Sequence, residues 1–304
     1  MSDPFTIGST EDLALERTKP LSDFYVLSPC VWREDSTYHL LVRAVNRSKI
    51  ASEKVARIYH GVGKTPTHFA MDQEPAIAPG PEASDRDGCE DPTVVTVDGI
   101  YYVFYSGWNQ AQQRGELLLA AGPSIHRLEK QGPLFANPAQ FRNAKEATVV
   151  RAADRSWRLF FEFAGDDRSQ IGVASAQAIN GPWKFEDQSI HARTDSWDNW
   201  HLSPGPISMQ DSQRPVMLYN GADRDARWRI GWVAFDSGFT RVVARSQDPL
   251  ITPPPKEEPE DTDIAFAASA LDDSGGVALY YTVADRRLMR SVLNRSAGTL
   301  IGGE

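Results

Sequence analysis

The sequence predicts an all-β fold, a five-bladed β-propeller with about four antiparallel strands in each blade. Three observations support this prediction. An aromatic-rich strand pattern recurs five times at intervals of about 60 residues, each copy follows a turn rich in Asp, Ser or Gly, and no long amphipathic helical pattern competes. The chain has 304 residues, enough for one large all-β domain, and we predict that residues 1–304 form a single propeller domain.

The recurring pattern is expected to be the second strand of each blade. Its residues are aromatic or aliphatic, as strands prefer, and the preceding turns suit tight hairpins. The five copies are residues 38–43, 101–106, 157–162, 215–220 and 277–282. The first strands are expected in the segments before the turns, at residues 29–32, 92–95, 147–150, 206–209 and 265–268.

Weaker signals mark the outer strands. Third strands are expected at residues 116–120, 170–174 and 229–233, and fourth strands at residues 74–77, 132–135 and 248–252. The chain ends too soon after residue 282 to supply two further strands to the last blade. We therefore predict that the N-terminal segment around residues 5–7 adds an outer strand to that blade and closes the ring.

Composition excludes several classes of function. The net charge is −9 with no basic stretch that would serve a nucleic acid, and no apolar run is long enough to cross a membrane. The two cysteines form no disulfide framework or zinc pattern, and we expect no metal or cofactor. The N-terminus shows no secretion signal, so we expect a cytoplasmic protein. An oligosaccharide is the expected partner, and self-association into a homo-oligomer stays open.

The first strand of each propeller blade lines the central channel, so polar residues at its start are site candidates. These are Ser28, Glu90, Asp91, Lys145, Glu146, His201, Ser203 and Asp263. The ends of the second strands add Arg43, Glu162 and Asn220, and nearby loops add Trp108, Trp197 and Trp200. Converging carboxylates suit glycosidic-bond cleavage, which needs an acid and either a base or a nucleophile. Aromatic faces would hold a sugar ring, and Trp108 and Trp200 are the better candidates.

Residues 88–92 (Gly-Cys-Glu-Asp-Pro) resemble the Gly-x-Glu-Asp-Pro-Arg signature of glycoside hydrolase family 130. Residues 41–44, 204–207, 218–221, 230–236, 243–253 and 280–285 resemble further segments of that family in the same order. The resemblance spans nearly the whole chain. It implies a five-bladed propeller that acts on β-mannosides as a phosphorylase or a hydrolase, with an inverting mechanism.

The resemblance also implies that Asp91 is the general acid, which protonates the glycosidic oxygen through a sugar hydroxyl. Two departures from the family pattern bear on whether phosphate or water accepts the sugar. The family's phosphorylases have Arg and His where this chain has Thr93 and Asn220, and both basic residues help to hold phosphate. Arg142, Lys145 and Arg168 could still supply positive charge. We therefore expect a hydrolase, with Glu146 as the first candidate for the base and Asp263 as the second.

Structural readings of the same residues stay open. Asp91 could be a turn residue before Pro92, Arg43 could serve only to pair with a channel carboxylate, and His201 could be a buried core histidine. Alternative functions are a phosphorylase of the same family, a furanosidase-type propeller glycosidase and a sugar-binding propeller without catalysis.

Overall fold

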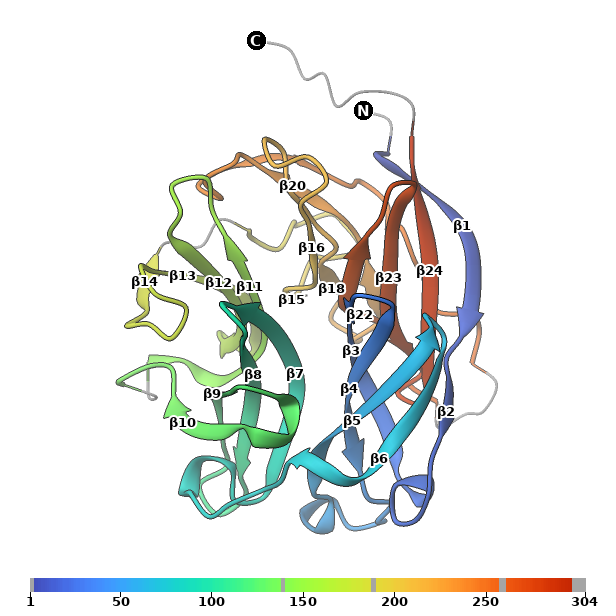
Figure 1. Ribbon diagram of the computed structural model, residues 1–304. Helices are drawn as coiled ribbons and strands as arrows, with labels where there is room; N and C mark the ends of the chain where they lie inside the picture. The colour runs from blue at the N-terminus through green and yellow to red at the C-terminus, as the bar shows by residue number, and fades with distance from the viewer. Residues whose placement is uncertain (1–2, 138–139, 187–189, 257–260, 297–304) are drawn as a thin grey trace.

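Antiparallel strands in five successive groups make up the computed structural model, which describes residues 3–137, 140–186, 190–256 and 261–296 (Figure 1). Blade 1 holds β3 (Tyr25–Glu34), β4 (Thr37–Val45), β5 (Ala56–Thr65) and β6 (His68–Ile77). Blade 2 holds β7 (Gly88–Val97), β8 (Ile100–Asn109), β9 (Arg114–Gly122) and β10 (Glu129–Pro133). Blade 3 holds β11 (Arg142–Arg151), β12 (Trp157–Gly165), β13 (Arg168–Ala176) and β14 (Lys184–Glu186). The all-β prediction is thus confirmed, and each recurring segment of these blades is a second strand.

Short 3-10 helices connect some of the strands. They are η1 (Leu21–Asp23), η2 (Ala51–Glu53), η3 (Ala83–Asp85) and η4 (Ile125–Arg127). Among the described residues, no helix has the length and apolar character that a membrane span requires.

Blade 4 is divided into two small sheets. The sheet nearer the start of the blade contains β15 (His201–Ser203), β18 (Asn220–Ala222) and β19 (Trp228–Ile230). The other contains β16 (Ile207–Ser208), β17 (Val216–Met217), β20 (Val233–Phe235) and β21 (Val242–Arg245). Pro204 and Pro206 interrupt the first strand because proline has no N–H for the ladder. Gly205 lies between them, where an added Cβ would be 1.8 Å from the carbonyl oxygen of Leu218.

The prediction that residues 248–252 form the fourth strand of blade 4 is wrong. The edge position belongs to β21, which pairs with β20. Ile251 forms only an isolated bridge with Ile230. Pro249 cannot donate a ladder hydrogen bond, and this segment therefore continues along the blade as a connection rather than as a regular strand.

The N-terminal strand completes blade 5, as the sequence predicted. Blade 5 holds β22 (Ala265–Asp272), β23 (Gly276–Val283) and β24 (Arg287–Arg295), and β1 (Phe5–Asp12) pairs antiparallel with β24. The register places Phe5 opposite Arg295 and Ile7 opposite Leu293. The chain then continues into β2 (Ala14–Glu16), which pairs in parallel with β6 of blade 1. The N-terminal segment therefore joins the last blade to the first.

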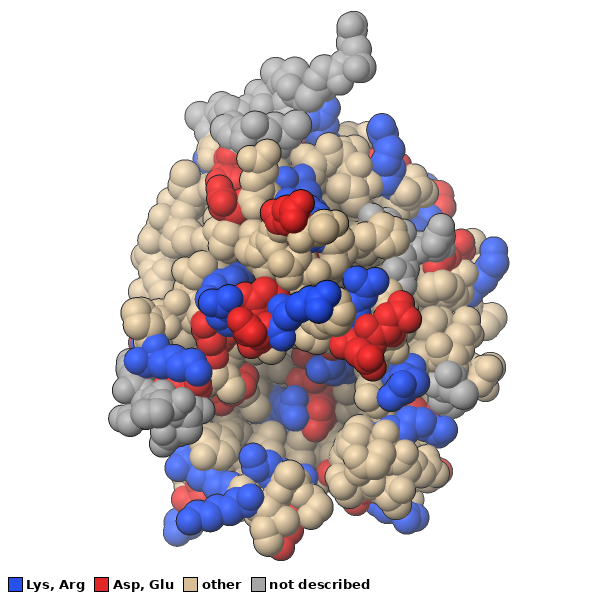
Figure 2. All heavy atoms as spheres, turned by 180° about the vertical axis from the view of Figure 1, so that it is seen from behind, with Lys and Arg blue, Asp and Glu red and all other residues tan. Residues whose placement is uncertain are grey.

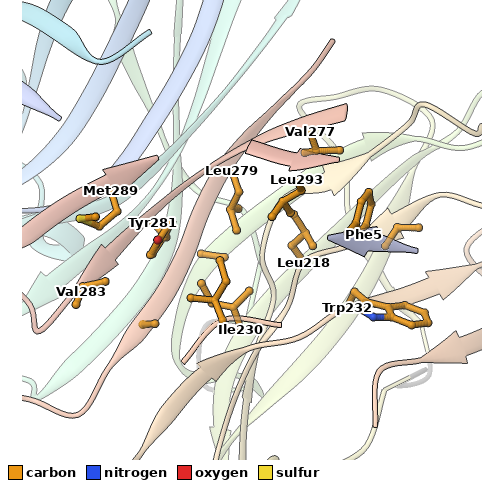
Figure 3. Packing of buried hydrophobic residues seen from close by; sticks show 14 of the residues in the cluster. Phe5, Leu218, Ile230, Trp232, Val277, Leu279, Tyr281, Val283, Met289 and Leu293 are labelled. Carbon is orange, nitrogen blue, oxygen red and sulfur yellow. The ribbon is translucent and has the colours of Figure 1, made fainter. Parts of the chain in front are cut away.

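Five hydrophobic clusters lie between neighbouring blades, so each blade shares its core with two others. Blades 1 and 2, 2 and 3, 3 and 4, 4 and 5, and 5 and 1 each share one cluster. Figure 3 shows the cluster between blades 4 and 5, in which Phe5 of β1 lies beside Leu293 and Trp232. This cyclic sharing of core residues closes the ring and places the five first strands around its axis.

Replacing Phe5 with Ala should destabilise the whole protein, because it leaves a cavity in the cluster between blades 4 and 5 where β1 is anchored. We expect a loss of about 3–5 kcal/mol in the free energy of unfolding, measured by chemical denaturation. Ile7→Ala is the matched control, since Ile7 lies on the same strand with 46% of its surface exposed. Equal losses in the two variants would show that β1 contributes only its backbone to closure.

Candidate active site

Bulges in the first strands of blades 1, 2 and 3 define the geometry of the site. In each strand the pairing register skips, between Leu27 and Cys30 in β3 and at the corresponding places in β7 and β11. One residue within each bulge has a left-handed backbone: Ser28 (φ 51°), Asp91 (φ 49°) and Glu146 (φ 52°). Bulges re-aim side chains and are common next to active sites. Three blades therefore present their polar residues in the same unusual conformation.

Asp91 is fixed at one carboxylate oxygen and free at the other. Its side chain is buried, and its Oδ1 accepts hydrogen bonds from Ser28 Oγ at 2.7 Å and from Arg43 Nη1 at 3.3 Å. Arg43 Nη2 also pairs with Glu90 Oε1 at 2.9 Å. The Oδ2 atom of Asp91 is buried and has no hydrogen-bond partner among the described residues. The carboxylate thus presents one oriented oxygen that a ligand hydroxyl could reach.

Blade 3 supplies a second group of charges. Lys145 Nζ lies 3.4 Å from Glu162 Oε1, and Ser169 Oγ donates to the same Glu162 oxygen at 2.6 Å. Glu162 Oε2 is buried without a partner among the described residues. Lys145 and Glu162 face each other across the β11–β12 pair, immediately before the bulge that carries Glu146. Electrostatic coupling between Glu146, Asp91 and Glu162 shows that the two groups form one cluster.

The surroundings shift the pKa values of Asp91 and Glu146 in opposite directions. Burial disfavours ionisation of Asp91, but Arg43 and Lys145, with hydrogen bonds from Ser28 and Arg43, lower its pKa overall. Burial, Asp91 and Glu162 together raise the pKa of Glu146 well above its usual range, although Lys145 and Arg43 oppose this. Of the two carboxyl groups, Glu146 is therefore the one that holds a proton more readily.

Blade 4 contributes a neutral histidine. The N–H of Ser169 donates to His201 Nδ1 at 3.1 Å, so in the neutral ring the proton is on Nε2. Burial lowers the pKa of His201 and Lys145 adds to this, while Glu162 and Asp223 raise it. The ring also stacks on Trp228, with centroids 5.6 Å apart. His201 is therefore a hydrogen-bond donor held beside the Glu162 group.

Other predicted residues are less directly connected to this cluster. Asp263 pairs with Arg229, at 2.9 Å between Oδ1 and Nη1, between blades 4 and 5. The ring of Trp200 is covered by the guanidinium of Arg224 at 4.1 Å, and Arg168 lies 5.7 Å from its centroid. Trp108 is partly exposed and donates from Nε1 to Gln110 at 3.0 Å. Of these rings, Trp108 is the better platform for a sugar.

Asn220 belongs to the packing between blades rather than to an exposed binding surface. It is fully buried, and its Nδ2 donates to the carbonyl oxygens of Pro204 and Ala267 while its Oδ1 accepts from Ala267 N at 2.7 Å. Thr93 has a similar role, since its Oγ1 donates to the carbonyl oxygen of Ala147 at 2.7 Å. Both positions where this chain departs from the phosphorylase pattern therefore join one blade to the next.

The sequence did not reveal how two serines organise the site. Ser28 was a first-strand candidate, but its contact with Asp91 of the next blade was not predicted. Ser169 links Glu162 to His201 and carried no motif signal. It also lines a small cavity of about 50 Å³ with Arg168 and Trp200. Among the described residues, the group with metal-ligand geometry involves none of these side chains.

The surface charge is mixed. Figure 2 shows Lys and Arg side chains next to Asp and Glu side chains across one face, with both signs around a hollow in its lower part. No broad single-sign patch covers the described part of that face. This distribution suits a neutral polar ligand better than a polyanion.

The fold and the channel-end cluster define a class of protein, the five-bladed β-propellers with buried carboxylates at one end of the channel. The model of glycoside hydrolase family 130, described as β-1,4-mannooligosaccharide phosphorylase, matches residues 12–291. The chain belongs to glycoside hydrolase family 130, as the resemblance in its sequence indicated.

Individual relatives are distant but extend over most of the chain. A 1,2-β-oligomannan phosphorylase of Thermoanaerobacter sp. (strain X514) is 23% identical over 260 residues, which are 83% of this chain and 84% of the relative. The solved β-1,2-mannobiose phosphorylase of Listeria innocua, in complex with β-1,2-mannobiose, has a TM-score of 0.77 at 18% identity and covers 91% of this chain and 92% of its own.

A further similar solved structure is described by the statement that the GH130 family of mannoside phosphorylases contains glycoside hydrolases that target β-1,2-mannosidic linkages in Candida mannan. Its TM-score is 0.76 at 20% identity, covering 92% of this chain and 87% of that one. At such identities the solved structures establish the shared fold alone, and they do not decide between phosphate and water as the acceptor.

Replacing Asn220 with Ala should destabilise the protein because it leaves buried backbone groups of blades 4 and 5 without partners. We expect a loss of about 1–3 kcal/mol for each group left unsatisfied, measured by urea denaturation. Asn46→Ala is the control, since Asn46 bonds Glu53 and Val55 in a surface loop where water can replace it. A stable Asn220→Ala protein would mean that Asn220 does not hold the blades together.

Proposed function

We propose that this protein cleaves β-mannosidic bonds in oligosaccharides, with Asp91 as the proton donor. The observation that carries the proposal is the buried, unpartnered Oδ2 of Asp91, which is held in place through Oδ1 by Ser28 and Arg43. An unsatisfied buried carboxylate oxygen costs free energy unless a ligand meets it, and a sugar hydroxyl is a suitable donor. The relatives named above act on mannosides, which supports the choice of sugar.

Catalysis requires the proton to be on Asp91 when the glycosidic bond breaks. In the free protein Glu146, whose pKa is raised, holds a proton more readily than Asp91 does. We infer that substrate binding moves this proton to Asp91, either directly or through a sugar hydroxyl. Asp91 then donates it to the leaving oxygen, and Glu146 is left ionised. One proton is thus sufficient to make an acid and a carboxylate base from the same pair.

Phosphate is the acceptor that the relatives favour, since the named enzymes among them are phosphorylases. Phosphate is itself the nucleophile in phosphorolysis and needs no base, so Glu146 would serve only as the source of the proton that passes to Asp91. Lys145 and His201 are the nearby donors that could contact the anion.

Water is the second candidate acceptor, and two specific observations favour it. Thr93 and Asn220 replace the basic residues that the family's phosphorylases use, and both are committed to contacts between blades. Arg43 and Lys145 are already paired with carboxylates. Hydrolysis would require an ionised Glu146 to activate water on the face opposite Asp91.

Product analysis with and without inorganic phosphate tests the proposal. We expect wild type to release sugar from β-mannosides, as sugar 1-phosphate if phosphate is the acceptor and as free sugar if water is. Asp91→Asn should reduce kcat by about 10²–10⁴-fold because it removes the donated proton. Asp98→Asn is the control, since Asp98 lies exposed in the turn at the far end of the same strand. Full activity of Asp91→Asn would overturn its role.

Glu146→Gln separates the two acceptors. If Glu146 activates water, the variant should lose about 10²–10⁴-fold in kcat, and wild-type kcat/KM should rise with pH through the raised pKa of Glu146. The rise would then lie above the pH of about 4.3 at which an ordinary glutamate ionises. If phosphate is the nucleophile, the variant should lose much less, because no base is needed and Asp91 can take its proton from solvent. Steady-state kinetics across pH, with a mannoside and with phosphate varied, measure both effects.

A further inference from the structure

A histidine cluster lies between blades 1 and 2, outside the candidate active site. His60 on β5 is buried, and its Nδ1 lies 2.7 Å from Asp72 Oδ2 on β6. His126 of η4, in blade 2, approaches the same Asp72 oxygen with its Nδ1 at 3.8 Å. The three donor atoms lie within 4.8 Å of one another. Two successive blades therefore direct two imidazoles at one carboxylate.

A second layer of contacts extends from the other side of His60. Its Nε2 lies 3.1 Å from His39 Nδ1, and His39 Nε2 lies 3.7 Å from Glu34 Oε2. Glu34 is fixed by hydrogen bonds from Tyr101 at 2.6 Å and Trp32 at 2.8 Å. Burial opposes ionisation of Glu34, but these two hydrogen bonds lower its pKa. The result is a chain of contacts that runs from Asp72 through two imidazoles to a carboxylate.

The proton count of this chain favours a cation. Two neutral imidazoles carry two hydrogens in total, which are enough for the hydrogen bonds of His60 with Asp72 and with His39. In that arrangement His39 Nε2 is a bare nitrogen 3.7 Å from Glu34 Oε2, too far for a hydrogen bond but close enough for repulsion. A cation on the Asp72 side resolves this, because His60 can then turn its remaining proton to His39, and His39 can turn its own to Glu34.

We propose that His60, Asp72 and His126 bind a divalent transition-metal ion, with zinc as the best match, and that His39 accepts a hydrogen bond from the other ring nitrogen of His60. Two nitrogens and one oxygen are ligands that zinc accepts, and water would complete the coordination. A metal-ligating histidine characteristically donates its other ring N–H to a fixed partner, as His60 would to His39.

The geometry requires only a small adjustment to bind the ion. Zinc ligands lie about 2.0–2.2 Å from the metal, which places ligand atoms roughly 3–3.5 Å apart. The separation of 2.7 Å between His60 and Asp72 would widen slightly, and that of 3.8 Å between Asp72 and His126 would shorten. His126 can make this movement because 65% of its side chain is exposed.

The ion would connect two blades at their shared edge. His60 and Asp72 belong to blade 1 and His126 belongs to blade 2, and the hydrophobic cluster between these blades includes Ile125 beside His126. Such a site would stabilise the interface between the blades without entering the reaction. It uses no residue of the Asp91 cluster, so its presence is independent of the proposed activity.

Tag-free protein, first dialysed against a chelator, should bind one equivalent of Zn²⁺ by isothermal titration calorimetry. Its Tm should rise with the free Zn²⁺ concentration, because the ion binds the folded state. Co²⁺ as a probe should give visible absorption bands from a site with nitrogen and oxygen ligands. His126→Ala should abolish stoichiometric binding and the rise in Tm, and this exposed residue should not be needed for folding. His39→Ala should weaken binding by about 10–100-fold while leaving all three ligands in place.

His68→Ala is the matched control, because His68 lies on β6 like Asp72 and pairs with Glu16 outside the cluster. It should bind zinc as wild type does. Equal affinity in wild type and His126→Ala would overturn the proposal, as would a Tm that does not respond to Zn²⁺. In either case the extra cation in the chain of contacts would be a proton shared between His39 and His60.

Discussion

Shared cores between neighbouring blades are the constraint on which the rest of this structure depends. No blade has a hydrophobic core of its own, since each of the five clusters draws residues from two adjacent blades. A ring of this kind is complete only when its last blade meets its first. The pairing of β1 with β24, followed by that of β2 with β6, provides that connection, and Phe5 of β1 packs into the cluster between blades 4 and 5. Closure is therefore a condition for every interface, including those that carry the carboxylates of the candidate site.

Hydrogen bonds between neighbouring blades repeat this cyclic arrangement around the axis. Thr93 reaches Ala147, Thr148 reaches Gly205 at 2.9 Å, Asn220 reaches Ala267, and Ser269 reaches Pro29 at 2.6 Å. Between blades 1 and 2 the equivalent connection is made by Ser28 and Asp91. Asp91 is thus both a site residue and part of the inner ring. This double role explains why its Oδ1 is held firmly while its Oδ2 stays free.

The sequence predicted the fold well because propeller strands are local signals, with hairpins and aromatic runs recurring at one spacing. It failed in blade 4, where Pro204 and Pro206 divide the sheet and Pro249 lies in the expected edge strand. Side-chain partners were harder to predict. That Arg43 pairs with Glu90 and Asp91 depends on bulges in two strands, which no residue pattern reveals.

The same limit applies to the histidine cluster. Its three proposed ligands lie at positions 60, 72 and 126, in two blades, and share no short motif. For this reason the sequence alone predicted no metal site. Regular spacing of ligand residues in a sequence reveals metal sites that are built on one turn or one helix. The histidine cluster is instead brought together by the packing of β5, β6 and η4.

The choice between phosphate and water depends on the charge balance of one buried cluster. Four carboxylates, from Glu90, Asp91, Glu146 and Glu162, lie around two cations, Arg43 and Lys145. Burial and this excess of negative charge raise the pKa of Glu146. A phosphate dianion would add to the excess and would raise the pKa of both Glu146 and Asp91, whereas water would not. The acceptor therefore bears on how readily a proton passes between the two carboxyl groups.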